Sequence, residues 1–158
     1  MKALLAAHPY EEPAFDLYPL LNEGEKRGLG RIGRLSEPVS LAEYVSRLRT
    51  VLSAPALRYV GNPDTRISKV ALCSGSGASL LHDAVRSGAD LLVTGDVKYH
   101  DARDAEDLGL SLIDAGHFPT EIIMVHEITE RLGRALSAAG YTECRIESCR
   151  TETDPFRI

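Results

Sequence analysis

The sequence contains too few cysteines for a disulfide framework. Its three cysteines are Cys73, Cys144 and Cys149, an odd number without C-x-x-C spacing. If residues 142–149 form a strand, the side chains of Cys144 and Cys149 point to opposite faces and cannot pair with each other. Unpaired cysteines are typical of a reducing compartment. We therefore expect a cytoplasmic protein whose thiols are buried or incidental.

Long apolar runs and basic clusters are also missing. No apolar stretch approaches the ~18 residues of a membrane span, and the opening MKALLAAHPY lacks the cleavage boundary of a signal peptide. The net charge is −5, and no more than two lysines or arginines are adjacent. The sequence therefore predicts no membrane span and argues against nucleic-acid binding, which needs a basic surface. It does not argue against a protein partner.

From Ser36 onward, helical and strand patterns alternate. Ser40 and Glu43 form an S-x-x-E capping box in front of a helix. Apolar runs predict strands at 57–61, 69–74, 90–95 and 110–116, and a last strand near 142–149. Helices are expected after the glycine turn at 75–77, over about 98–108 and over about 119–138. This order predicts the α/β class: a mostly parallel sheet with helices on both faces.

Residues 1–35 differ from the rest. They contain three prolines, the acidic pair Glu11-Glu12 and the glycine-rich GLGRIG. The segment AFDLYPL is compatible with a strand, and NEGEKRGLG with a turn or hairpin connection. His8, with two carboxylates nearby, suggests either a metal ligand or a rigid proline-flanked turn, and the prolines favour the turn.

The expected parallel strands end in three polar loops: SGSGAS, GDVKYH and GHFPTE. Ligands of open α/β sheets collect at the carboxyl ends of the strands. His117 and Glu121 lie four positions apart and so share one helix face, where an imidazole and a carboxylate suit zinc, manganese, iron or cobalt. The alternative is a loop histidine followed by a glutamate that complements the helix dipole. Two ligands alone are too few for a protein zinc site.

The other two loops allow similar alternatives. Asp96 suits a helix cap near residue 98 or a supporting role in a metal site, and His100 is a candidate for proton transfer or for supporting a ligand. The SGSG turn offers free N–H groups to a phosphate, but it lacks the G-x-G-x-x-G spacing and a Walker lysine. Glycines that let the helix pack closely on the sheet are the favoured explanation.

Five segments taken in order resemble one known family: HPYEEPAFDLYPL, GLGRIG, CSGSGASLL, GADLLVTGDVKYHDARDA and LIDAGHFPTE. They resemble the carboxyl-terminal half of the Nif-three-like dinuclear-metal-centre proteins, also known as GTP cyclohydrolase I type 2 homologues. The resemblance implies that residues 36–158 are that α/β half. It also implies that residues 1–35 are the remnant of a CutA-like insertion and a linker, with residues 1 to about 7 ending its last helix and HPYEEPAFDLYPL forming its final strand.

The resemblance further implies a site for two divalent metal ions. His117 and Glu121 would be ligands, and a His-His pair and an aspartate would come from an amino-terminal half that this sequence lacks. We therefore expect a fragment or half-protein that needs a complementing amino-terminal half. The family forms hexameric rings, so a homo-oligomer is also expected.

Three functions follow as hypotheses. The first is a metal-dependent hydrolase of the cyclohydrolase type, with Asp96 and His100 supporting the metal or transferring protons. The second is a non-catalytic metal-binding or assembly module, which is inactive alone because the amino-terminal ligands are missing. The third is nucleotide binding through the SGSG turn without a metal.

Overall fold

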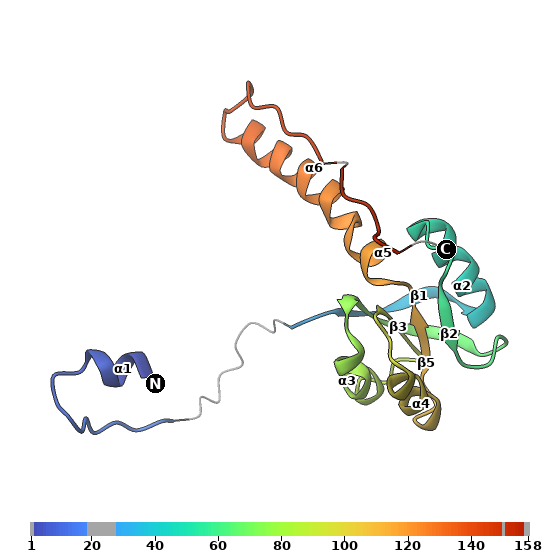
Figure 1. Cartoon of the computed structure of the whole chain (residues 1–158), viewed down its shortest axis with the longest axis horizontal. Helices are drawn as coiled ribbons and strands as arrows, with labels where there is room; N and C mark the ends of the chain where they lie inside the picture. Colours follow the sequence, from blue (N-terminus) through green and yellow to red (C-terminus); the bar gives the residue numbers. More distant parts are fainter. Residues whose placement is uncertain (1, 19–27, 150, 157–158) are drawn as a thin grey trace.

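A five-stranded sheet forms the centre of the molecule (Figure 1). The computed structural model describes residues 2–18, 28–149 and 151–156. Its elements are α1 (Lys2–Ala7), β1 (Arg31–Ser40), α2 (Leu41–Leu52), β2 (Arg58–Val60), β3 (Arg66–Ser76), the 3-10 helix η1 (Ala78–Leu80), α3 (Leu81–Arg86), β4 (Leu91–Gly95), α4 (Tyr99–Asp107), β5 (Ser111–Asp114), α5 (His117–Glu121) and α6 (Ile123–Ala138).

The strand order is β1-β3-β4-β5-β2. The three central strands run parallel, and the edge strands β1 and β2 each pair antiparallel with their neighbour. Helices cover both faces, with α2 on one side and α3 and α4 on the other. The predicted fold class is therefore confirmed, with the parallel pairing confined to the centre of the sheet.

Strand β4 shows how the sheet divides the core into two layers. Leu91 and Val93 pack in the cluster that contains α2, whereas Leu92 packs with α3 and α4. This follows from the strand geometry, because successive side chains point to opposite faces. Every residue of β4 is buried, as expected for a central strand covered on both faces.

Strand β1 was not expected from the sequence. Its glycine-rich start resembles a loop, and Pro38 cannot donate a hydrogen bond to a ladder. The structure places β1 at the edge of the sheet, with an irregular register between Arg34 and Val39 that contains Pro38. An edge position and an irregularity are the places where a strand tolerates proline. The strand runs across positions 35 and 36, where the sequence suggested a boundary.

Two predicted strands are wrong. Residues 14–18 of AFDLYPL and residues 142–149 form no strand, and most of their side chains are exposed. A strand needs a partner that supplies backbone hydrogen bonds, and neither segment pairs with a strand of the sheet within the described residues. Figure 1 shows residues 8–18 away from the sheet and the carboxyl-terminal segment beside α6. The helix α1 agrees with the helix end implied for residues 1–7. Of the turn expected at NEGEKRGLG, residues 22–27 lie outside the described residues.

The expected helix over 119–138 begins earlier and is divided at Ile122 into α5 and α6. Helix α5 lies against β3 and β4 at the rim of the sheet. Helix α6 projects away from the sheet (Figure 1) and contains no buried residue. The division therefore separates a short helix that is fixed to the sheet from a long helix that is not.

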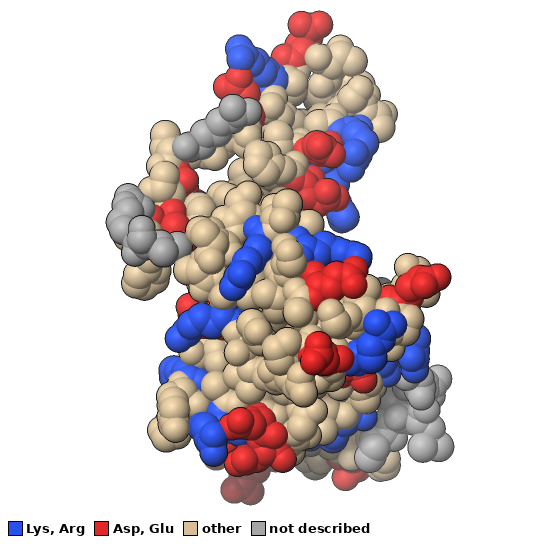
Figure 2. Space-filling view, turned by 90° about the vertical axis from the view of Figure 1, so that its right-hand side faces the viewer, with Lys and Arg blue, Asp and Glu red and all other residues tan. Residues whose placement is uncertain are grey.

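Charged side chains of both signs are interspersed on the face shown in Figure 2, which displays no continuous basic surface. Among the helices that the structure describes, none is long and apolar enough to cross a membrane.

Candidate metal centre

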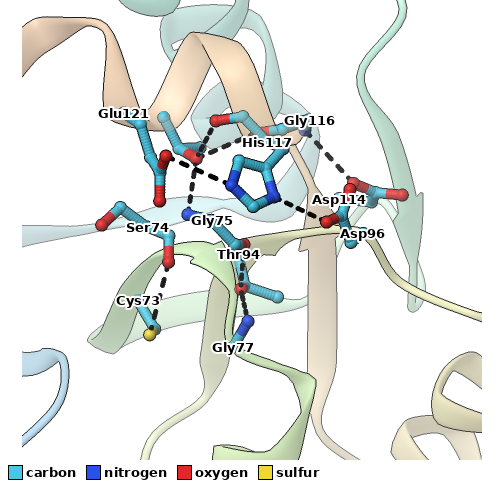
Figure 3. Close-up of polar contacts among 11 residues, drawn as sticks. Cys73, Ser74, Gly75, Gly77, Thr94, Asp96, Asp114, Gly116, His117 and Glu121 are labelled. Atoms are coloured by element: carbon cyan, nitrogen blue, oxygen red, sulfur yellow. Dashed lines mark hydrogen bonds and ion pairs between the residues drawn. The ribbon is translucent and has the colours of Figure 1, made fainter.

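The carboxyl ends of β3, β4 and β5 bring three loops together (Figure 3). The end of β3 supplies Ser74 and Gly75, the residue after β4 is Asp96, and α5 follows β5 and carries His117 and Glu121. Because these three strands are parallel neighbours, the loops share one rim of the sheet.

His117 lies between two carboxylates. Its Nε2 is 3.2 Å from Oε2 of Glu121, and its Nδ1 is 2.6 Å from Oδ2 of Asp96. Metal–ligand bonds of about 2.0–2.2 Å at the angles of a tetrahedral or octahedral ion separate neighbouring ligand atoms by roughly 3.0–3.5 Å. The separation of Nε2 and Oε2 matches this range, and both side chains remain about half exposed. The pair therefore fits two neighbouring ligands of one divalent ion.

Asp96 supports the ring of His117 and does not cap α4. The carboxylate of Asp101 accepts the hydrogen bond from the backbone N–H of Lys98 at the start of that helix. Asp96 has φ 54°, an uncommon backbone conformation for a residue with a side chain. Its carboxylate binds Nδ1, so Nε2 is left to face Glu121, and such second partners fix ring orientation in metal sites. The sequence allowed Asp96 either to cap the helix or to support a metal ligand. The structure shows the contact with His117 and no cap on α4.

The two carboxylates stabilise the protonated, positively charged form of the His117 ring. The hydrogen bond that Nδ1 of His117 donates to the carboxylate of Asp96 is the main cause that raises the pKa of His117 above its ordinary value, with smaller contributions from the charges of Glu121 and Asp96. Desolvation opposes this rise because it disfavours the charged ring. A proton and a metal ion would therefore compete for the same nitrogen.

His100 does not join this cluster. It lies in the first turn of α4, where its ring makes an edge contact with the ring of Tyr99. Its spacing from Asp96 suggested proximity to the site, but α4 starts at Tyr99. Among the described residues, no hydrogen bond, ion pair or ring contact joins His100 to His117 or Glu121. A role in proton transfer remains a prediction.

Gly75 makes room for the His117–Glu121 pair. Its φ is +61°, and a Cβ there would fall within contact distance of Oε1 of Glu121 and 3.2 Å from Nε2 of His117. A side chain at position 75 would thus fill the space in front of both ligands. The sequence explanation of these glycines, close packing of helix on sheet, misses this role, although Gly77 does pack against Cys73 and Thr94.

Two buried threonines tie the SGSG turn to the site. Oγ1 of Thr120 accepts the N–H of Gly75 at 2.9 Å, and Oγ1 of Thr94 accepts the N–H of Gly77 at 2.8 Å. The Thr120 hydroxyl lies close to the backbone carbonyls of Gly116 and His117 as well. These N–H groups already have acceptors, so they are not free for a phosphate. The geometry therefore argues against nucleotide binding through this turn.

Sequence reasoning missed Asp114 and Arg58. Asp114 ends β5, where Oδ1 accepts the N–H of Gly116 at 3.2 Å and Oδ2 pairs with Nη2 of Arg58. These two contacts of Asp114 fix the turn before His117. Gly116 in this turn has φ +84°. The pair links residues 56 positions apart, so no local pattern signals it.

Within residues 2–18, 28–149 and 151–156, no three His, Cys, Asp or Glu side chains are grouped to hold a metal ion. Asp96 meets the histidine on the opposite ring nitrogen from Glu121. The described chain therefore offers two converging ligands. His8 belongs to a turn, in which its Nδ1 accepts the N–H of Tyr10.

The sequence matches one protein family over almost its whole length. The model of Duf34/NIF3 (NGG1p interacting factor 3) matches residues 4–155. A Halalkalibacterium halodurans protein named GTP cyclohydrolase 1 type 2 homolog is 44% identical over 154 residues, which is 98% of this chain and 41% of that protein. A Bacillus subtilis protein of the same name is 37% identical over 156 residues, 99% of this chain and 41% of that protein.

Two solved structures are also similar. A Bacillus cereus protein related to NIF3 has a TM-score of 0.81 at 39% identity, covering 99% of this chain and 43% of that one. A Staphylococcus aureus protein has a TM-score of 0.82 at 31% identity, covering 99% and 44%. The chain thus spans less than half the length of these relatives. It belongs to the Duf34/NIF3 (NGG1p interacting factor 3) family.

Proposed function

We propose that this chain supplies two ligands, His117 and Glu121, to a divalent-metal site of a metal-dependent hydrolase. The observation that supports this most is the 3.2 Å separation of Nε2 and Oε2, with Nδ1 of the same ring held by Asp96. The remaining ligands of a two-metal site would come from a polypeptide that corresponds to the amino-terminal part of the longer relatives. Zinc, manganese, iron and cobalt all accept this donor set.

The residues of this chain would perform three tasks. Glu121 and the neutral ring of His117 would bind the ion, and Asp96 would hold the ring in the tautomer that leaves Nε2 unprotonated. Gly75 would keep the space in front of the ligands open. When bound, a divalent ion supplies a Lewis acid that activates water and polarises the bond under attack.

The test is the metal content of the purified chain, alone and mixed with the amino-terminal part of a relative such as the Halalkalibacterium halodurans protein. We expect weak metal binding by the chain alone, because two ligands are too few for a tight site. We expect about two ions per complex in the mixture. Tight binding by the chain alone would contradict the proposed division of ligands.

Replacing Asp96 by asparagine should weaken metal binding about 10–100-fold, the usual effect of losing a carboxylate behind a ligating histidine. The amide of asparagine lacks the charge that favours the required tautomer. Competition with a chromophoric chelator measures the affinity. Asp107→Asn, at an exposed position of α4, is the control; equal affinities of the two variants would exclude the proposed role of Asp96.

A second candidate function is a non-catalytic metal-binding or assembly module. The limited ligand set favours it, and so does an exposed apolar stripe on α6 formed by Met124, Ile128 and Leu132. These residues recur every four positions and share one helix face. Exposed apolar surface of this kind marks an interaction site. We therefore propose that the chain assembles as a homo-oligomer, in the cytoplasm that its three free cysteines suggest.

The double variant Ile128→Glu with Leu132→Glu should reduce self-association, because it places two carboxylates within the α6 stripe. Light scattering coupled to size-exclusion chromatography measures the mass. Arg131→Glu is the matched control, since it changes the net charge by the same amount outside the stripe. An equal loss of mass in both proteins would attribute the effect to charge and remove the stripe as the interface.

A further inference from the structure

Helix α5 carries both candidate metal ligands but is too short to hold its own position. It consists of the five residues His117–Glu121, whereas isolated helices shorter than about 12–15 residues are only marginally stable in water. The helix that follows, α6, contains no buried residue, so it does not anchor α5 to the sheet. The positions of His117 and Glu121 therefore depend on the contacts between α5 and the rim of the sheet.

Thr120 is the one buried residue of α5, with 7% of its surface exposed. Its Oγ1 accepts the N–H of Gly75 at 2.9 Å. The same atom lies 2.8 Å from the carbonyl oxygen of His117 and 2.9 Å from that of Gly116. A hydroxyl can donate one proton and accept at its lone pairs, so Thr120 can bind the turn and its own helix at the same time. One atom thus connects the end of β3 with the start of α5.

Gly75 is the residue of β3 that faces the ligand pair. A Cβ at this position would lie 3.2 Å from Nε2 of His117 and would collide with Oε1 of Glu121. The carbonyl oxygen of Gly75 accepts a hydrogen bond from Oγ1 of Thr94 in β4 at 3.1 Å (Figure 3). The backbone of Gly75 is therefore held by β4 on one side and by α5 on the other. The bond from Thr120 sets how closely the ligand pair approaches this turn.

Packing alone does not explain a hydroxyl at position 120. A valine has nearly the same shape, whereas a buried hydroxyl is unfavourable unless its hydrogen bonds are made. Valine would also leave the buried N–H of Gly75 without its acceptor. Hydrogen bonds prefer a narrow range of distance and angle, so those of Thr120 restrict the orientation of α5 as well as its distance from β3.

We propose that Thr120 is a positioning residue of the candidate metal centre. It holds α5 against the end of β3, so that Nε2 of His117 and Oε2 of Glu121 keep the 3.2 Å separation that suits one ion. Its hydroxyl is engaged by backbone groups, so it acts through the two ligands and is not a ligand itself. As a statement about metal binding, this inference rests on the proposed function; as a statement about how α5 is held, it does not.

The first test uses the full chain without metal. Amide hydrogen exchange followed by NMR reports whether the N–H of Gly75 keeps its acceptor. Thr120→Val should accelerate the exchange of this N–H about tenfold or more relative to that of Leu92 in β4, because the turn then opens locally. Thr120→Ser keeps the hydroxyl and should exchange as the wild type does. Thr129→Val is the matched control, since it removes a hydroxyl that bonds a helix carbonyl at 2.7 Å in α6, outside the candidate metal centre.

The second test measures zinc binding in the mixture with the amino-terminal part of the Halalkalibacterium halodurans relative. Competition with a chromophoric chelator should show that Thr120→Val weakens zinc binding about tenfold or more, as the loss of groups that orient metal ligands does. Thr120→Ser and Thr129→Val should keep the wild-type affinity. Thr120→Ala is measured as well, because the space that it leaves can admit a water molecule to the N–H of Gly75. This variant should fold even if the valine variant does not.

Three results would overturn the inference. Thr120→Val could leave the exchange of Gly75 unchanged, it could accelerate Gly75 and Leu92 equally, as a general loss of stability would, or it could retain the zinc affinity of the wild type. A failure of the proposed function gives a different result. The wild-type mixture then takes up no zinc, while the exchange of Gly75 still shows whether Thr120 holds the turn.

Discussion

Replacing His117 by alanine is expected to abolish metal uptake by the assembled site and to leave the fold intact. The variant removes one of the two ligands that this chain would contribute, and protein zinc sites generally need three or four. The side chain of His117 is 48% exposed, so its loss creates no cavity in the core. Metal content measured by mass spectrometry after dialysis, with the amino-terminal part of a relative present, reports the effect.

His126→Ala is the matched control, because it removes an exposed imidazole from α6 outside the cluster. It should retain the full metal content. Glu121→Gln should behave as His117→Ala does, since it keeps the size of the side chain and removes the charge. Unchanged stoichiometry in His117→Ala would remove the metal-site hypothesis, together with the hydrolase that depends on it.

Replacing Leu91 by alanine is expected to cost about 2–5 kcal/mol of the free energy of unfolding. Leu91 is 0% exposed and lies in central strand β4, in the cluster that joins the sheet to α2. Alanine loses the burial of the side chain and leaves a cavity that rigid neighbours on two sides cannot fill. A domain of this size has only about 5–15 kcal/mol in total, so the loss is a large fraction of its stability.

Urea denaturation followed by circular dichroism measures this loss. Leu108→Ala, at a leucine that is 41% exposed after α4, is the control and should cost well under half as much. A similar loss in both variants would show that burial at position 91 does not dominate the stability of the sheet.

Local patterns predicted the centre of the molecule well. Ser40 caps α2 through the N–H of Glu43, as the S-x-x-E pattern predicts, and the three apolar strand patterns became the parallel centre of the sheet. These signals are strong because a buried strand must be apolar and a helix start must satisfy its free N–H groups. At the candidate metal centre, the four-residue spacing of His117 and Glu121 correctly predicted two convergent side chains.

Patterns failed where a segment depends on a distant partner. The sequence around Pro38 resembles a loop, and it became an edge strand because β3 supplies hydrogen-bond partners. Residues 142–149 resemble a strand, and they remain irregular because they pair with no strand of the sheet. Strand formation requires a neighbour, which no single segment encodes.

The sequence by itself determined the α/β class, the family and the helical spacing that puts His117 and Glu121 on one face. Only the tertiary structure decided that Asp96 binds Nδ1 of His117 while His100 stays outside the cluster, that Gly75 leaves space for the pair, and that Arg58 reaches Asp114 across 56 positions. The physical reason is that helical periodicity is a property of neighbouring residues, whereas contacts between loops depend on how parallel strands align their carboxyl ends.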